Sequence, residues 1–400
     1  MTPLGSGTIN RKDSILSSPN TSSHLQSSTN IANMSRPVFT AVFISIFYLA
    51  KVAIYDLSVT NGLMGSTESA LAGEPITFTT LKPLDSLLTM LVRFFKPILD
   101  GNDPNLTLFS IFMAGQLLAV HVLIQVEGLR AGNRERLVSY TTSWGMLWQL
   151  ITFGATLPLY FLAYLYTSPI PGSLTPDELA AAISIDPVQA RAVIGSLTFG
   201  AFIPTLLAAL PSPSIITPRT QEILLAVWQA FPLWSDIWQL IFAQLIGALG
   251  VVPSAAKSRP LTKINDFRRI YAYALSVVAV TTYGVIGYVF WKADWASETA
   301  FESMVQILRP TSPWSQVKMV SLERGILDLL QWDTYCASLA TWSWIVYLAY
   351  ETKGVGQVVM DLGKLVMWSA VVGPGGAALA VVWGRDVRVL RSADGKKKTG

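Results

Sequence analysis

The chain has 400 residues, of which 51% are hydrophobic and only 14% are charged, and its net charge is +4. A soluble domain carries about 25% charged residues, so this chain lacks the polar surface that water requires. Its single cysteine, Cys336, excludes an internal disulfide and a multi-cysteine metal site, and two histidines, His24 and His121, argue against a histidine-based one.

Long apolar runs predict a polytopic membrane protein of the all-α class, a bundle of transmembrane helices. Residues 1–36 are rich in Ser, Thr and Asn and are expected to form a disordered cytosolic tail. Residues 37–384 should form the transmembrane domain, with about eight spans (roughly seven to nine), and residues 385–400 a basic cytosolic tail. The expected spans are 37–55, 106–126, 143–165, 192–210, 222–250, 270–290, 327–349 and 357–383.

Two of these spans are expected to be interrupted. The fifth is too long for a straight crossing and contains Pro232, and the eighth contains Gly373-Pro-Gly-Gly376, so both should bend or break. Between the first two spans, Leu84–Leu99 is amphipathic and is predicted to lie along the membrane interface.

The basic residues lie in loops and in the tail, a pattern that orients membrane proteins and does not suit nucleic-acid binding. It places both termini in the cytosol. The basic stretch 251–269 would then lie outside. Either this loop is an exception, or the fifth segment re-enters the membrane and shifts the count by one.

The fifth span carries a polar stripe at spacings of seven, seven and three: Glu222, Gln229, Asp236 and Gln239. At 3.6 residues per turn these side chains share one face, beside an aromatic stripe. Because an ionised carboxylate within a membrane costs at least a few kcal/mol, Asp236 is a candidate functional residue. The alternative is that Asp236 only hydrogen-bonds a neighbouring helix.

The seventh span repeats this arrangement in LDLLQWDTYCASLATWSW. Trp332 and Tyr335 share one face with Asp328, and Asp333 projects beside small residues that leave room for a ligand. A tryptophan belt at the membrane interface is the alternative, although it fits Trp332 poorly. Asp328 is equally well explained as a residue at the end of the span.

A third candidate site ends the second span, in QVEGLRAGNRERLVSY. Glu127 lies on the same helix face as Gln116 and is followed by Arg130 and Asn133. The simpler interpretation is a positively charged stop after a span. An inward-facing glutamate ahead of a Gly-Asn turn is nevertheless more than topology requires.

Motifs for several other chemistries are absent from the sequence. There is no aspartate-rich magnesium motif for diphosphate departure, no glycine-rich nucleotide loop and no HExxH. No metal and no cofactor are therefore predicted. Isolated carboxylates among many aromatic rings leave one coherent enzymatic option: a protonated acid donates to an alkene or an epoxide, and ring faces stabilise the carbocation in a dry pocket.

Several stretches resemble the fungal membrane-bound terpene cyclases of ascochlorin, ascofuranone and macrophorin biosynthesis. VEGLRAGNRERLVS resembles that family's Glu-x-x-Arg-x-Gly-Asn element, and WGMLWQLITFGATLPLYFLAYL resembles its Gly/Gln helix that ends in Pro-Leu-Tyr. FIPTLLAALPSP, WQAFPLW and LLQWDTY are similar to its later helices. The resemblance implies proton-initiated cyclisation of a farnesyl chain or its terminal epoxide, often on an aromatic polyketide, as in a meroterpenoid. It carries over five residues: Glu127, Arg130, Asn133, Asp236 and Asp333.

The chain departs from that family pattern at two positions, because Gly128 and Leu129 stand where the family often has a serine and a second arginine. We expect Asp333 or Asp236 to be the general acid, ahead of Glu127. Gln229 and Gln239 would orient the acid. The binding pocket would be formed by Trp228, Trp234, Trp238, Trp332 and Tyr335, with Arg130 and Asn133 as further candidates.

The expected protein is thus a terpene cyclase of the endoplasmic reticulum membrane. Its partners would be membrane lipid and a lipophilic prenylated substrate, supplied by a pathway prenyltransferase and epoxidase, with no nucleic acid. A proton-coupled transporter is one alternative, although the sequence lacks the two related halves typical of transporters. A non-catalytic membrane scaffold of the pathway is the other, and it predicts co-purifying partners without activity.

Overall fold

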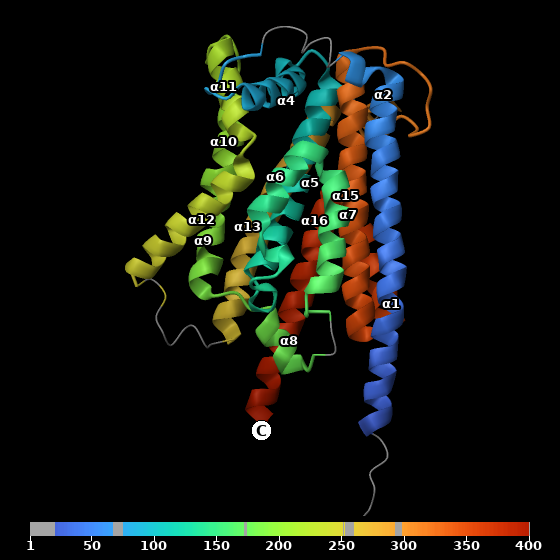
Figure 1. Cartoon of the computed structure of the whole chain (residues 1–400), viewed down its shortest axis with the longest axis vertical. Helices are drawn as coiled ribbons and strands as arrows, with labels where there is room; N and C mark the ends of the chain where they lie inside the picture. The colour runs from blue at the N-terminus through green and yellow to red at the C-terminus, as the bar shows by residue number, and fades with distance from the viewer. Residues whose placement is uncertain are drawn as a thin grey trace, which may run out of the picture.

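The computed structural model describes residues 21–66, 75–171, 174–250, 252, 260–292 and 298–399. Within these ranges the secondary structure is helical and no β-strand occurs, which confirms the predicted all-α class. Figure 1 shows an elongated bundle in which α1 begins at the same end where the chain finishes. The largest core cluster joins residues of α5, α7, α13, α15 and α16, whose bounds are given next.

The helices follow one another in a single chain order, with short π- and 3-10-helical turns between some of them. The helices are α1 Thr21–Ala50, α2 Leu57–Asn61, α4 Lys82–Asp100, α5 Pro104–Leu129, α6 Thr141–Ile151, α7 Phe153–Thr167, α8 Pro176–Ala182, α9 Pro187–Leu197, α10 Ile203–Ala208, α11 Pro218–Trp228, α12 Phe231–Ala248, α13 Pro260–Lys292, α14 Glu298–Leu308, α15 Leu322–Lys353 and α16 Val355–Thr399. The turns are η1 Lys51–Asp56, η2 Ala131–Asn133, η3 Leu137–Ser139 and η4 Thr198–Phe202.

Five helical segments are long and apolar enough to cross a membrane: Ser35–Asn61, Pro104–Leu129, Pro187–Ala208, Lys263–Lys292 and Val355–Ala393. They coincide with five of the expected spans, so the chain has the helices of a membrane protein. The expected spans at 143–165 and 222–250 are each divided into two shorter helices, and α15 buries a row of polar side chains. The count of eight crossings therefore stays a prediction.

The two divided spans have different causes. Between α6 and α7, Thr152 adopts φ 73° and ψ 162°, a backbone conformation that a β-branched residue rarely takes, and the helix cannot continue through it. Between α11 and α12, Gln229 and Ala230 form a turn, and Pro232 occupies the first turn of α12, where a missing N–H costs nothing. The interruption expected near Pro232 is confirmed.

The helix α16 folds back on itself at Gly373, which has φ 77° and ψ 170°, and residues of both arms line one cavity. Gln116 of α5 binds the backbone at this turn. Its side-chain nitrogen donates to the carbonyl of Val372 at 3.1 Å, and its side-chain oxygen accepts from the N–H of Gly375 at 2.9 Å. The expected bend is thus a complete reversal, whose freed backbone groups are satisfied by a buried glutamine.

The helix α4 lies across one end of the bundle, between α11 and α5 (Figure 1). Its side chains Leu88, Phe95 and Leu99 pack against Leu225 and Trp228 of α11. The helix covers the amphipathic segment Leu84–Leu99 expected from the sequence. Its placement along the membrane interface remains a prediction.

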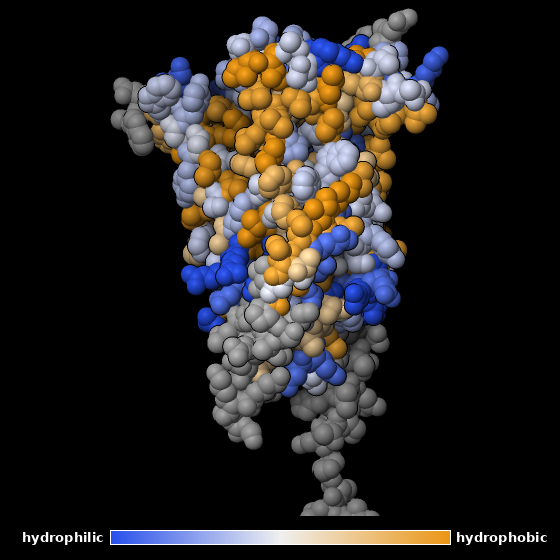
Figure 2. Space-filling view, turned by 90° about the vertical axis from the view of Figure 1, so that its left-hand side faces the viewer, coloured by the Kyte–Doolittle hydropathy of each residue, from blue (hydrophilic) through white to orange (hydrophobic). Residues whose placement is uncertain are grey.

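The outer face near α9 to α12 is apolar. Figure 2 shows hydrophobic side chains over the upper and middle part of this face, with hydrophilic side chains at its top edge and lower down. On α12 the large exposed side chains include Leu233, Ile237, Leu240 and Leu245. An apolar surface of this extent suits contact with lipid rather than water.

Candidate functional site

The three residues of the Glu-x-x-Arg-x-Gly-Asn motif form one buried network at the end of α5. Glu127 is 1% exposed, and Arg130 and Asn133 are 0% exposed. Arg130 Nε donates to Glu127 Oε1 at 2.7 Å, and Asn133 Nδ2 donates to the Glu127 carbonyl at 2.8 Å and to Oε2 at 3.1 Å. Tyr164 of α7 donates to the same Oε2 at 3.2 Å. Because η2 turns the motif back onto the last turn of α5, one segment both ends the helix and surrounds the glutamate with donors.

Asp386, on the second arm of α16, completes this network and was not identified from the sequence. Arg130 Nη2 and the Tyr271 hydroxyl of α13 both donate to Asp386 Oδ2 at 2.7 Å. Arg130 Nη1 donates to the Ile183 carbonyl at 3.0 Å, so one guanidinium ties together α5, the α8–α9 connection and α16. Asp386 lies in residues 385–400, which the sequence predicts to be a basic tail. An aspartate among arginines does not indicate that its side chain is buried.

Asp236, on α12, lies against the first turn of α6. Its Oδ2 accepts hydrogen bonds from the hydroxyl of Thr141 at 2.9 Å and from the hydroxyl of Thr142. Thr141 also packs against Gly128, where a Cβ would lie 2.6 Å from Thr141 Cγ2. Gly128 therefore leaves the space that Thr141 needs beside Asp236.

Asp333, on α15, lies at the break between α6 and α7. Its Oδ1 accepts a hydrogen bond from the backbone N–H of Gly154, in the first turn of α7. The first N–H groups of a helix have no partner within the helix and favour a negative charge, so Asp333 caps α7 from a neighbouring helix. The approach is close, because a Cβ on Gly154 would lie 2.7 Å from the Asp333 carbonyl and 2.9 Å from Cys336 Cβ.

Four aromatic side chains at the α6–α7 and α11–α12 breaks form what we call the aromatic row: Phe153, Trp148, Phe231 and Trp228. Trp148 stacks on Phe153 with ring centroids 4.3 Å apart and on Phe231 at 6.3 Å. Phe231 stacks on Trp228 at 5.8 Å. Phe153 directly precedes Gly154, the partner of Asp333, and Phe231 shares α12 with Asp236. The row thus joins the two helix breaks, and Asp333 lies at the α6–α7 break.

His121 of α5 lies edge-on to the aromatic row. The sequence pattern did not indicate this position. Its ring centroid lies 5.4 Å from that of Trp148 and 5.5 Å from that of Phe231, at interplanar angles of 85° and 78°. The side chain is 4% exposed, and neither ring nitrogen has a hydrogen-bond partner among the described residues. A histidine inside an apolar span was the signal that could have identified it.

Two further polar groups beside the row are unpartnered within the ranges that the structure covers. They are Trp148 Nε1 and the side-chain amide of Gln229, which is 4% exposed and follows Trp228. More than nine in ten buried polar groups in proteins are hydrogen-bonded. These free donors and acceptors make the surroundings of the stacked rings a candidate site for a ligand with both polar and apolar parts.

The other candidates on α12 lie outside the aromatic row. Gln239 donates to the Gln189 carbonyl of α9 at 2.9 Å, and Trp238 packs on Phe199 with ring centroids 5.1 Å apart. Trp234 donates to the Val227 carbonyl at 2.8 Å. Because α11 and α12 are separate helices, the polar stripe does not continue to Glu222, which pairs with Arg219 at 3.4 Å.

Trp332 and Tyr335 of α15 bind the backbone at the end of α14 and just after it. Trp332 Nε1 donates to the Thr311 carbonyl at 2.8 Å, and the Tyr335 hydroxyl donates to the Leu308 carbonyl at 2.5 Å. Asp328 accepts from Arg324 at 2.9 Å. The structure does not bring Trp332 or Tyr335 to the aromatic row.

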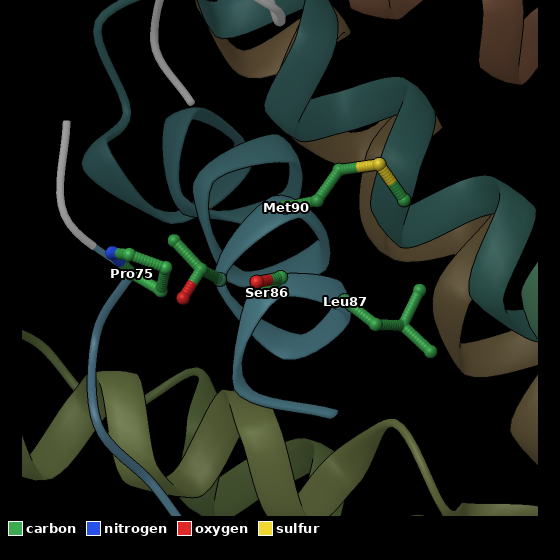
Figure 3. A pocket seen from close by; sticks show the side chains of 5 residues that line it. Pro75, Ser86, Leu87 and Met90 are labelled. Atoms are coloured by element: carbon green, nitrogen blue, oxygen red, sulfur yellow. The ribbon is translucent and has the colours of Figure 1, made fainter. Parts of the chain in front are cut away.

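Two cavities stand out, and neither is lined by a predicted catalytic residue. The larger, of about 540 Å³, lies between α8, α15 and α16. The smaller, of about 310 Å³, lies along α4 and has no ionisable lining residue. Figure 3 shows Leu87 and Met90 of this smaller cavity pointing away from Pro75, so its side chains do not converge as those of a catalytic site do. Over the described residues, no three His, Cys, Asp or Glu side chains are placed to hold a metal ion.

Comparison with known proteins assigns the family. The CtvD-domain model matches residues 39–390. Among curated relatives, the terpene cyclase ascI of Acremonium egyptiacum is 31% identical over 80% of this chain and 82% of its own length. The terpene cyclase penA of Penicillium crustosum is 28% identical over 84% and 94%, and the terpene cyclase ctvD of Aspergillus terreus is 27% identical over 83% and 94%. No solved structure matches the chain. A match over most of the chain to this one domain means that the protein belongs to the CtvD-domain family.

Proposed function

We propose that the protein is a membrane-bound terpene cyclase that protonates a farnesyl chain, or its terminal epoxide, on a lipophilic prenylated substrate, with Asp236 as the acid. The three curated relatives described above are named terpene cyclases, and the apolar helices suit a substrate that is dissolved in lipid. The observation that carries the choice of acid is the kind of hydrogen-bond partner that each carboxyl group has.

Both hydrogen bonds to the Asp236 carboxyl group come from hydroxyl groups, whereas a hydroxyl is only one of several partners of Glu127. A threonine hydroxyl can donate to a carboxylate and can also accept from a carboxylic acid, so Thr141 and Thr142 suit both protonation states. Asp333 accepts from the backbone N–H of Gly154, which can only donate and cannot accept a hydrogen bond from the protonated acid.

Glu127 is less suited to donate a proton than either aspartate. Its partners include Arg130 and Asn133, whose nitrogens only donate, and Arg130 keeps its charge. The tyrosine hydroxyl of Tyr164 is the one partner that could reverse its role. We therefore assign Glu127, Arg130 and Asn133 to holding the helices together, and not to proton transfer.

The reaction follows from these assignments. The acid proton of Asp236 adds to the terminal alkene carbon or to the epoxide oxygen, and the internal double bonds then form ring C–C bonds as the positive charge moves along the chain. The final cation loses a proton or is captured by an oxygen of the substrate. Faces of the aromatic row stabilise the moving charge, since a desolvated cation over a tryptophan gains about 2 kcal/mol or more. Trp148 and Phe153 are buried, which keeps water that would quench the cation away from this part of the row.

Gln229 and Trp228, which lie at the row, are assigned to substrate binding. Gln239, Trp234, Trp238, Trp332 and Tyr335 are assigned to shaping the helices around it. A pathway prenyltransferase must supply the prenylated substrate. If the protein cyclises the epoxide and not the alkene, an epoxidase must act before it. We place this chemistry in the endoplasmic reticulum, where such membrane enzymes meet a lipid-dissolved substrate.

The test is to express the full chain in a heterologous host and to supply a farnesylated phenol and its terminal epoxide to isolated membranes in D2O. Cyclisation of the alkene fixes one deuterium on carbon, whereas cyclisation of the epoxide places it on an exchangeable oxygen. The proposal expects a cyclised product from one of the two substrates, detected by mass spectrometry. Full cyclisation by the Asp236→Asn, Asp333→Asn double variant would overturn it.

A further inference from the structure

We propose that the cavity between α8, the end of α15 and the two arms of α16 binds the phosphate head group of an anionic membrane lipid. Its volume of about 540 Å³ is within the range of small-molecule sites. It lies toward the end of the bundle where α1 begins and the chain finishes, and Figure 1 shows α8 beside the lower part of α16. The inference does not depend on the proposed cyclisation.

Arg385, on the second arm of α16, is the lining residue whose unpaired hydrogen-bond donors point to a ligand. Its side chain is 12% exposed, and none of its three guanidinium nitrogens has a hydrogen-bond partner in the part of the chain that the structure describes. Arg385 Nη1 forms an ion pair with Asp386 Oδ1 at 3.6 Å, a distance too long for a hydrogen bond, and the other oxygen of Asp386 binds Arg130. Because a guanidinium stays charged and offers five N–H donors, its burial without acceptors is costly until a ligand supplies them.

The other charged residues make the cavity basic. Arg388 and Lys353 add two more cations to its lining. Both acids of the lining already have partners, since Glu351 accepts a hydrogen bond from Ser35 and Asp361 pairs with Lys364 at 3.2 Å. A phosphate matches this set, because its oxygens accept paired hydrogen bonds from a guanidinium.

The remaining wall of the cavity selects a lipid over a free phosphate ion. It is apolar and includes Ile345 and Leu348 of α15, Val381 and Val382 of α16, and Leu179 of α8. An ion would leave these side chains uncovered, whereas the glycerol and first acyl carbons of a phospholipid would bury them. Basic pockets between transmembrane helices on the cytosolic side are known binding sites for anionic lipid head groups, and the expected orientation places this end in the cytosol.

The experiment measures lipid binding to the full chain by native mass spectrometry in detergent, with phosphatidic acid and phosphatidylcholine as probes. We expect phosphatidic acid to bind at least about tenfold more tightly than phosphatidylcholine, and Arg385→Gln to weaken phosphatidic acid binding about tenfold. Arg391→Gln is the matched control, because Arg391 is exposed on the same arm and outside the cavity lining. It should leave the Kd unchanged within about twofold.

The exposed Arg388 gives a second variant in case Arg385→Gln does not fold. Arg388→Gln should weaken phosphatidic acid binding by about threefold or more. Equal binding of the two lipids, or an unchanged Kd in both Arg385→Gln and Arg388→Gln, would overturn the inference. Displacement of phosphatidic acid by millimolar inorganic phosphate would also overturn it, since the site would then hold a free ion.

Discussion

Arg130 and Asp386, which are 256 residues apart in the chain, form a buried ion pair at 2.7 Å with both side chains 0% exposed. Asp386→Asn should destabilise the protein by about 3–5 kcal/mol, because it leaves part of the Arg130 charge buried and uncompensated. Asp56→Asn is a matched control, since Asp56 forms an equally short but exposed pair with Lys51. That change should cost less than about 1 kcal/mol. Apparent Tm of the two purified variants checks the difference, and equal losses would show that the Arg130 network does not hold the bundle together.

His121→Phe tests whether the free ring nitrogens at the aromatic row serve the substrate. Phenylalanine keeps an aromatic ring against Trp148 and Phe231, so the apparent Tm should not fall. Turnover should drop about 10- to 100-fold if a ring nitrogen binds a polar group of the substrate. Trp238→Phe, a change outside the row, should alter turnover less than about threefold. An active His121→Phe variant would reduce His121 to a packing residue.

The Gly128–Thr141 contact predicts a rescue. Gly128→Ser places a Cβ 2.6 Å from Thr141 Cγ2, which should displace Thr141 from Asp236 and cost about 1–3 kcal/mol, with a fall in turnover. Thr141→Ser removes that methyl group and keeps the hydroxyl. The double variant should therefore recover most of the lost turnover. Additive losses in the double variant would mean that this contact does not set the position of the Asp236 partner.

The reversal in α16 can be tested by comparing two glycines of that helix. Gly373→Ala should destabilise the protein by about 1–3 kcal/mol, because φ 77° disfavours an L side chain and a Cβ there would lie 2.6 Å from Gln116 Nε2. Gly363 has no atom within 4 Å of an added Cβ, so Gly363→Ala should be neutral or stabilising by up to about 1 kcal/mol. Apparent Tm distinguishes them, and a harmless Gly373→Ala would argue against the observed turn.

The sequence was sufficient for the helical class, for the interruptions near Pro232 and Gly373 and for the membrane character, because apolar runs and breakers are local signals. It could not show that Gly373 reverses the chain, since that depends on Gln116 of a distant helix. Nor could it show the break at Thr152, because threonine is not a helix breaker and Asp333 supplies the capping bond from α15.

The candidate site was only partly visible in the sequence for the same reason. Glu127, Arg130 and Asn133 lie close together in the chain and are joined in the structure, whereas Asp386 joins them from the far end. The periodicity argument that grouped Gln229 with Gln239 assumed one continuous helix. The break at Ala230 separates them, and it brings Phe231 to His121 instead.

The most direct test of the central claim compares Asp236→Asn with Asp333→Asn in reconstituted, folded protein supplied with the substrate that the wild type cyclises. Asparagine can still accept from the threonine hydroxyls but cannot supply the acid proton, so Asp236→Asn should lower the rate of cyclisation about 100- to 10,000-fold. Asp333→Asn should mainly lower the apparent Tm, and it should keep a larger share of the wild-type cyclisation rate than Asp236→Asn does. A folded Asp236→Asn protein that cyclises at the wild-type rate would contradict the account.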